Sequence, residues 1–259
     1  MTESTVRGIV ATHRLGITGT DTGIGKTLVA CALAARARER SWRVAAMKPV
    51  ESGIAERAGD DAVHPQSDAE RLRAACGSVA PLSVVRPYVL EEPLAPMIAA
   101  QRAHVTIDLD VLDSARASLE AEIDLLLVEG AGGLLVPITS SLSYLDLFAR
   151  WRCELVVVAG NRLGVLNHVL LTVRAAMQAQ VPVRAVVLND MSAREASVAE
   201  ATNFDALMQL LPSTPVFRFP WLHDHDDRRA LAAAVADSGL DALLPSMNHS
   251  PRPSLLSAR

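Results

Sequence analysis

Short apolar runs rich in Val, Leu and Ala alternate along the chain with longer stretches in which apolar positions follow helical spacing. The short runs are typical of strands, and the longer stretches are typical of helices that cover a sheet. Regular alternation of the two predicts βα units on a mostly parallel sheet. The predicted strands are residues 15–18, 43–47, 123–128, 155–158, 183–188 and 216–219. The predicted helices are residues 27–40, 109–121, 167–178, 196–211 and 229–236.

Two of the predicted strands are apolar at every position, LLLV at 125–128 and LVVV at 155–158. Such runs indicate central strands that are covered on both faces. A hydrophobic content of 50% with only 3% aromatic residues also favours helices over an aliphatic sheet rather than a β-sandwich. We predict a single three-layer α/β domain over residues 14–240, with flexible tails at 1–13 and 246–259. Residues 52–86 break the alternation and are predicted to form a loop and one short helix.

Charge and cysteine content narrow the class of protein. The net charge of -4 gives no basic footprint for nucleic acid. The sequence lacks both a run of 18 apolar residues and the apolar core of a secretory leader, so we expect no membrane association. Cys31, Cys76 and Cys153 lie far apart without CxxC spacing, which is typical of buried thiols in a reducing compartment. We therefore expect a soluble, cytoplasmic protein.

The strongest chemical signal is TGTDTGIGKT at residues 18–27, between the first predicted strand and a long predicted helix. Glycines allow backbone amides to turn toward an anion, and the helix that follows adds the positive end of its dipole. Lys26 can reach the β- and γ-phosphates of a nucleotide, and the Thr27 hydroxyl can bind Mg²⁺. The segment predicts a nucleotide site in a P-loop NTPase-like fold.

This loop departs from the strict GxxxxGK[ST] pattern. Thr20 stands where the pattern requires glycine, and Gly19 lies one residue too early. The alternative interpretation is a glycine-rich turn between strand and helix that binds no ligand. Such a turn requires neither the lysine nor the threonine, so we favour the nucleotide site.

The GTDTxxGKT form of the loop resembles that of the dethiobiotin synthetase family and of the related cobyrinic acid diamide synthases. Further segments resemble elements of the dethiobiotin synthetase family in the same order: KPVESG at 48–53, SDA at 67–69, VEGAGG at 128–133, LGVLNH at 163–168, ND at 189–190 and PWL at 220–222. Together they cover most of the chain, so the series is specific although each motif is short. The chain departs from the family at Gly23, where many relatives have Glu, and this leaves the nucleotide base preference open.

The positions of three charged residues support this resemblance on physical grounds. Lys48 and Glu129 each follow an apolar run that predicts a strand, and ligands gather at the carboxyl ends of parallel strands. Asp68 and Glu129 can complete an oxygen-rich Mg²⁺ site with Thr27. Lys48 and Lys26 can then stabilise charge on the transferring phosphoryl group as catalytic residues. The alternatives are a solvated lysine at Lys48 and a helix-capping or salt-bridged carboxylate at Glu129.

The resemblance implies a reaction and its substrates. The family converts 7,8-diaminononanoate, CO₂ and ATP into dethiobiotin, ADP and phosphate, with Mg²⁺ as cofactor. It implies that Ser52 contacts the carbamate or diamine end, and that Gly164, Val165 and Asn167 bind the distal carboxylate across the interface of a homodimer. Their place at a predicted helix N-terminus suits a carboxylate. An ordinary N-cap is the alternative for Asn167.

The resemblance also implies a set of nucleotide-binding residues, distributed from the phosphate loop to the last predicted strand. The set is Gly23, Ile24, Gly25, Lys26, Thr27, Leu28, Asp68, Glu129, Gly130, Ala131, Gly132, Asn189, Asp190, Pro220, Trp221, Leu222 and Asp227. Asn189 and Asp190 follow a predicted strand and can reach the base, with a simple turn as the alternative. Trp221 can line the base pocket or belong to the core.

Three other kinds of function are weighed against this interpretation. A partitioning or switch ATPase typically carries an early lysine in its loop, where this chain has Asp21. A cobyrinic-acid-type amidating ligase needs a glutaminase domain, for which the residues after 240 leave no room. A nucleotide-binding module without activity would not explain Lys48 beside Asp68 and Glu129.

Overall fold

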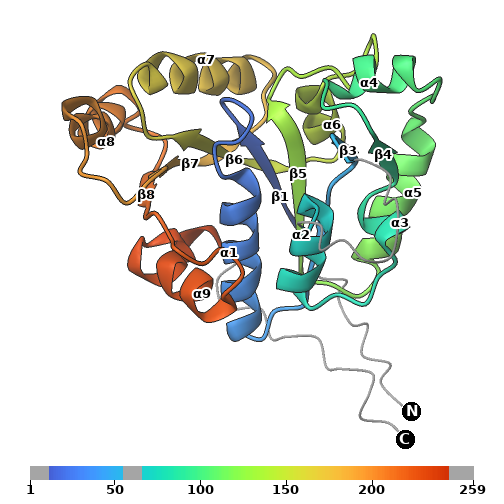
Figure 1. The fold of residues 1–259 in the computed structure, drawn as a ribbon, viewed down its shortest axis with the longest axis horizontal. Helices are drawn as coiled ribbons and strands as arrows, with labels where there is room; N and C mark the ends of the chain where they lie inside the picture. The colour runs from blue at the N-terminus through green and yellow to red at the C-terminus, as the bar shows by residue number, and fades with distance from the viewer. Residues whose placement is uncertain (1–11, 55–65, 245–259) are drawn as a thin grey trace, which may run out of the picture.

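The computed structural model describes residues 12–54 and 66–244, and its centre is a six-stranded parallel sheet (Figure 1). The strand order is β2-β5-β1-β6-β7-β8, and every neighbouring pair is parallel. The strands are β1 His13–Gly19, β2 Val44–Met47, β5 Leu125–Gly133, β6 Glu154–Gly160, β7 Val183–Asn189 and β8 Val216–Phe219. The predicted strands are confirmed, with ends that differ by a few residues.

Helices cover both faces of this sheet, as predicted. The helices are α1 Lys26–Glu39, α2 Asp68–Cys76, α3 Leu82–Val85, α4 Pro96–Arg102, α5 Leu109–Glu120, α6 Tyr144–Arg150, α7 Val165–Gln178, α8 Val198–Leu210 and α9 Arg228–Asp237, followed by the 3₁₀ turn η1 Leu240–Leu243. Alternate side chains of β5 point to opposite faces of the sheet, as they do on any strand. Leu125 and Leu127 pack with α1, α2 and α9, whereas Leu126 and Val128 pack with the cluster of α3 to α6. The three-layer fold is therefore confirmed.

Several short elements were not predicted. A second sheet pairs β3 Val50–Ser52 with β4 Tyr88–Leu90 in parallel, and the described part of 52–86 contains α3 as well as α2, where one helix was predicted. The two strands and α3 are three or four residues long, and α4 and α6, which were not predicted either, have seven residues each. Such elements are too short for periodicity to identify them. The strand β1 already begins at His13, inside the predicted tail, and buried Leu243 extends the packed structure beyond 240. Otherwise the predicted tails, and residues 55–65, lie outside the described residues.

The sheet brings the carboxyl ends of its strands to one edge. Gly19 at the end of β1 pairs with Gly133 of β5, and Gly160 of β6 pairs with Asn189 of β7. The loops that follow these strands therefore converge on the start of α1, which is the usual ligand side of an open α/β sheet. Across the ranges 12–54 and 66–244, no helix combines the length and the apolar character that a membrane crossing requires.

Candidate active site

The phosphate loop joins β1 to α1 through a turn that only glycine adopts easily. Gly25 is the N-cap of α1 with a φ of 97°, and no side chain caps the first amides of the helix. A Cβ on Gly25 would lie 2.3 Å from Nδ2 of Asn189. That amide in turn donates to the carbonyl of Ile24 at 3.0 Å, so β7 fixes the curvature of the loop. The uncapped amides of α1 therefore face the space where an anion would bind.

Lys26 begins α1 and folds back over the loop. Its ammonium donates to the carbonyl of Asp21 at 2.8 Å, and the side chain is buried in spite of its charge. Burial lowers the pKa of Lys26 to about 8, with the Glu129 carboxylate opposing the shift. A buried cation whose partner is a neutral carbonyl is well placed to exchange that partner for a phosphate oxygen.

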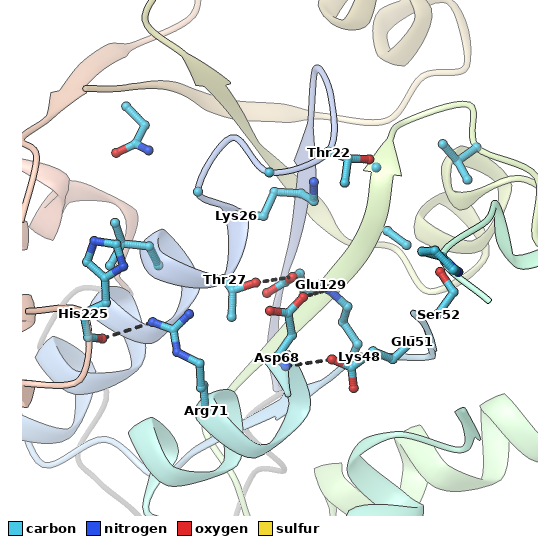
Figure 2. Close-up of a pocket in the computed structure, with 18 of the residues that line it drawn as sticks. Thr22, Lys26, Thr27, Lys48, Glu51, Ser52, Asp68, Arg71, Glu129 and His225 are labelled. Atoms are coloured by element: carbon cyan, nitrogen blue, oxygen red, sulfur yellow. Dashed lines mark hydrogen bonds and ion pairs between the residues drawn. The ribbon is translucent and has the colours of Figure 1, made fainter. Parts of the chain in front are cut away.

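Four predicted side chains meet at the start of α1 and the end of β5 (Figure 2). The ammonium of Lys48 lies 2.5 Å from Oε1 of Glu129 and 2.7 Å from Oδ2 of Asp68. The hydroxyl of Thr27 donates to the same Glu129 oxygen at 2.8 Å. Sequence positions up to 102 residues apart are thus joined in one cluster, and the predicted convergence of these residues is confirmed.

Burial sets the electrostatics of this cluster. Lys48 is 3% exposed and Glu129 is fully buried. Burial lowers the pKa of Lys48, but the Glu129 and Asp68 carboxylates raise it by more, so the pKa lies above its usual value. For Asp68, burial raises the pKa, but the Lys48 ammonium, the Thr27 hydroxyl and Arg71 together lower it by more, so the net shift is downward. Because Lys48 is buried and paired with two carboxylates, the alternative of a solvated strand-end lysine is wrong.

One oxygen of this cluster has no partner among the described residues. Oε2 of Glu129 is buried and makes no hydrogen bond there, whereas Oε1 accepts two. A buried carboxylate oxygen without a partner costs free energy, so such an atom needs an explanation. Oxygen atoms of Glu129, Asp68 and Thr27 are also the kind that Mg²⁺ prefers. The residues therefore fit a hard divalent cation, although the Glu129–Lys48 pair also matches the salt-bridge alternative.

A pocket of about 550 Å³ opens over this cluster. Figure 2 shows Ser52 and Glu51 on one side of Lys48 and Asp68, with Arg71 and His225 on the other. The predicted site residues that line it are Gly23, Gly25, Lys26, Thr27, Leu28, Lys48, Ser52, Asp68, Glu129, Ala131, Gly132, Asn189, Asp190 and Trp221. Trp221 is 37% exposed, so the alternative that it belongs to the core is wrong.

Some predicted nucleotide residues do not line the pocket. These are Ile24, Gly130, Pro220, Leu222 and Asp227. The carboxylate of Asp227 caps α9 by accepting from the amides of Arg229 and Ala230, and Leu222 packs against the core. Their contact with a nucleotide stays a prediction.

The predicted carboxylate site lies at the first turn of α7, away from this pocket. Gly164 is the N-cap with a φ of 91°, so the alternative that Asn167 is the N-cap is wrong. Asn167 is exposed and Val165 is buried. The binding of a carboxylate there stays a prediction.

Several pocket residues could not be predicted as site residues. They are Thr22, Glu51, Arg71, Pro93, Leu94, Ala95, Pro96, Val136, Met191 and His225. Thr22 lies inside the phosphate-loop motif and Glu51 inside the KPVESG segment, so both belonged to recognised motifs although neither was assigned a role. The others come from loops and helix faces whose residue types have no characteristic spacing.

Strand, glycine-rich turn and helix, with a buried lysine and a threonine beside two carboxylates, define a P-loop nucleotide-binding protein. Residues 13–229 match the AAA domain family. An ATP-dependent dethiobiotin synthetase BioD of Anaeromyxobacter dehalogenans strain 2CP-C is 40% identical over 223 residues, which cover 86% of this chain and 96% of the relative. The chain belongs to the dethiobiotin synthetase family.

Two further relatives carry the same name. The protein of Anaeromyxobacter sp. strain Fw109-5 is 43% identical over 68% of this chain and 75% of its own length. The ATP-dependent dethiobiotin synthetase BioD 1 of Salmonella typhi is 35% identical over 82% of this chain and 90% of its own length. The similarity thus extends over three quarters or more of the length of relatives from two genera.

Proposed function

We propose that the protein is an ATP-dependent dethiobiotin synthetase, which closes a ureido ring on 7,8-diaminononanoate with CO₂ and releases ADP and phosphate. The observation that carries the proposal is the position of the Lys48 ammonium. It lies between the carboxylates of Glu129 and Asp68, next to Thr27 and the phosphate loop. A cation in this position suits a phosphoryl-transfer reaction, in which charge on the transferring group must be stabilised.

The oxygen atoms of Thr27, Asp68 and Glu129 support a magnesium site. The buried Oε2 of Glu129 supplies an oxygen without a partner among the described residues. A bound Mg²⁺ would neutralise phosphate charge and orient the phosphate chain. Three protein oxygens are fewer than the six that Mg²⁺ takes, so phosphate oxygens and water would complete the shell.

The lysines would serve the two transfer steps. One amine of the substrate adds to CO₂ and loses a proton, and an oxygen of the resulting carbamate attacks the γ-phosphorus while the bond to ADP breaks. The second amine then attacks the carbamate carbon, and phosphate leaves. Lys26 would exchange the Asp21 carbonyl for a phosphate oxygen, and Lys48 would shift from Asp68 to the transferring group. Neither step needs a covalent bond to the enzyme; both need positioning and positive charge.

Different residues that line the pocket suit different ligands. The apolar surface of Pro93, Leu94 and Val136 suits a hydrocarbon chain, and the hydroxyl of Ser52 suits its amine end. Asn189 and Trp221 also line the pocket and suit a nucleotide base. A buried Oδ1 of Asn189 without a partner among the described residues suits a base amino group.

A homodimer would explain the separate carboxylate site. Gly164, Val165 and Asn167 begin α7, and the adjacent Leu163 and Leu171 are 85% and 58% exposed. We infer that a second copy of the chain covers this surface and brings the α7 N-terminus to its partner's diamine. We also assign the enzyme to the cytoplasm, where ATP is available and where its three free cysteines would remain reduced.

Phosphate release tests the proposed reaction. The purified protein is mixed with Mg-ATP, bicarbonate and 7,8-diaminononanoate, and phosphate and dethiobiotin are measured together. We expect both products in equal amounts, and neither without the diamine. Phosphate release that does not depend on the diamine would overturn the proposal in favour of a switch-type ATPase.

A further inference from the structure

Glu51 is a buried carboxylate that the proposed reaction does not use. It belongs to β3, one residue before Ser52, and is 3% exposed. Its Oε1 accepts from the backbone amide of Asp68 at 2.7 Å, and its Oε2 accepts from Nη1 of Arg86 at 2.6 Å. Each oxygen thus has a strong, charge-assisted or main-chain partner. Glu51 is tied to the protein on both sides rather than left open like Glu129.

The contact with the Asp68 amide fixes the first residue of α2. A helix leaves its first amides without partners inside the helix. Ser67 caps the amide of Glu70 in a capping box, and Glu51 supplies the acceptor that Asp68 needs. Arg86 reinforces both contacts, because its Nη1 also donates to Oγ of Ser67 at 3.0 Å. The start of α2 is therefore fixed from outside the helix, by a residue of β3 and by the residue that ends α3.

Residues 48–51 consequently bind Asp68 at two of its groups, the carboxylate and the backbone amide. Lys48 binds its carboxylate, and Glu51 binds its backbone amide. These two contacts differ in what would happen during catalysis. The Lys48 contact would be lost when Lys48 shifts to the transferring group, whereas the contact to the amide can persist through that exchange.

We propose that Glu51, supported by Arg86, is a positioning residue that holds Asp68 in place for the magnesium–nucleotide complex. This inference rests on the proposed function, since it assigns Asp68 to the metal. Glu51 acts through the main chain of Asp68 and does not itself bind the metal. Residues that orient a metal ligand typically contribute about 10–100-fold to metal affinity.

Binding of a non-hydrolysable ATP analogue, AMPPNP, at increasing Mg²⁺ concentration tests this role without turnover. Calorimetry gives the Mg²⁺ concentration at half-saturation for the full-length protein. We expect Glu51→Ala to raise it about tenfold. Glu51→Gln keeps an oxygen for the Asp68 amide, so its half-saturating Mg²⁺ concentration should stay close to that of the wild type. If Glu51→Gln is as impaired as Glu51→Ala, the carboxylate acts as a direct ligand and the proposal is wrong.

Glu70→Ala is the matched control. It removes the capping box of the same helix turn but leaves the Glu51–Asp68 contact in place. Thermal denaturation should show a lower Tm for both alanine variants, whereas the half-saturating Mg²⁺ concentration should change only for Glu51→Ala. Equal half-saturation in the two variants would overturn the inference. Wild-type protein that binds AMPPNP without any Mg²⁺ dependence would instead overturn the proposed function.

Discussion

The main sheet carries cations next to carboxylates at both ends of its parallel strands, but the pairs are built differently. We call the side where the strands begin the amino edge and the side where they finish the carboxyl edge. At the amino edge, Arg14 donates through two nitrogens to Glu120, at 2.5 and 3.0 Å. Arg43 is paired in the same way with Asp124. These arginine side chains are 28% and 31% exposed, and each carboxylate oxygen has a partner.

The carboxyl edge has the opposite construction. Lys48 is a point charge shared by Glu129 and Asp68, the pair with Glu129 is almost fully buried, and one Glu129 oxygen has no partner among the described residues. Removing charges from water is costly unless their hydrogen bonds are complete. At the amino edge every carboxylate oxygen of these pairs has a partner, which is typical of a structural ion pair, whereas an unpartnered buried carboxylate oxygen is typical of a binding site. The state of the carboxylate oxygens, rather than the presence of charge, distinguishes the two edges.

Substitution of Lys48 should give the largest effect. We expect Lys48→Ala to lower kcat by about 10²–10³-fold, the loss typical for one group that stabilises transition-state charge. Nucleotide affinity should stay near wild type, because the phosphate loop is intact. Steady-state phosphate release and calorimetry with AMPPNP measure the two quantities. Arg43→Ala, at the amino edge, is the control and should leave kcat unchanged; unaltered turnover in Lys48→Ala would remove Lys48 from the mechanism.

Crowding at the phosphate loop should give the next largest effect. Gly25→Ala places a side chain in the left-handed region and 2.3 Å from Asn189. We expect a loss of about 1–3 kcal/mol in the free energy of unfolding and weaker nucleotide binding, because Asn189 must leave the Ile24 carbonyl. Gly23→Ala is the control, since its φ is also positive but no atom lies within 4 Å of the added Cβ. Equal losses in the two variants would show that backbone strain alone determines the effect.

The sequence predicted the charged residues at the carboxyl edge better than the residues that hold them in place. Apolar runs identified the strands, and the rule that ligands gather at strand ends brought Lys48 and Glu129 to the phosphate loop. Asp68 followed from a resemblance only, because the chain between Ser52 and Asp68 has no periodic pattern. Glu51 could not be assigned a role, since its partner is a backbone amide 17 residues away. Main-chain contacts leave no signature in residue type.

The pocket walls were also beyond prediction. Pro93 to Pro96 and Met191 line the pocket from loops and a helix start whose positions depend on the packing of the whole domain. Asn167 illustrates a different limit. Its helix was predicted, but the carboxylate site proposed there includes a second chain, whose position a single sequence does not specify. Local patterns therefore predicted the reacting groups, and tertiary packing determines the surfaces that select substrates.

A substitution at the amino edge should change the stability of the protein without changing its activity. Glu120 accepts from both Arg14 and Arg116, so Glu120→Gln weakens three charge-assisted hydrogen bonds. We expect a loss of about 1–2 kcal/mol, which lowers the Tm by roughly 2–8 °C in a domain of this size. Thermal denaturation and phosphate release check the two parts. A large fall in kcat would show that the amino edge also contributes to catalysis.

The smallest effect is expected at Asp241, whose carboxylate accepts from Arg36 and Arg40 at the carboxyl end of α1, on the amino side of the sheet. Hydrogen bonding from Arg36 lowers the pKa of Asp241 in the folded protein. Its contribution to stability is therefore complete above the unfolded pKa of about 3.9 and is lost as the pH falls through the lowered folded pKa. The pair is partly exposed, so Asp241→Asn should cost less than about 1 kcal/mol at pH 7. Urea denaturation of both proteins from pH 7 to about pH 2.5 should show this difference shrinking below about pH 4, and a difference that stays constant would mean that packing rather than charge accounts for it.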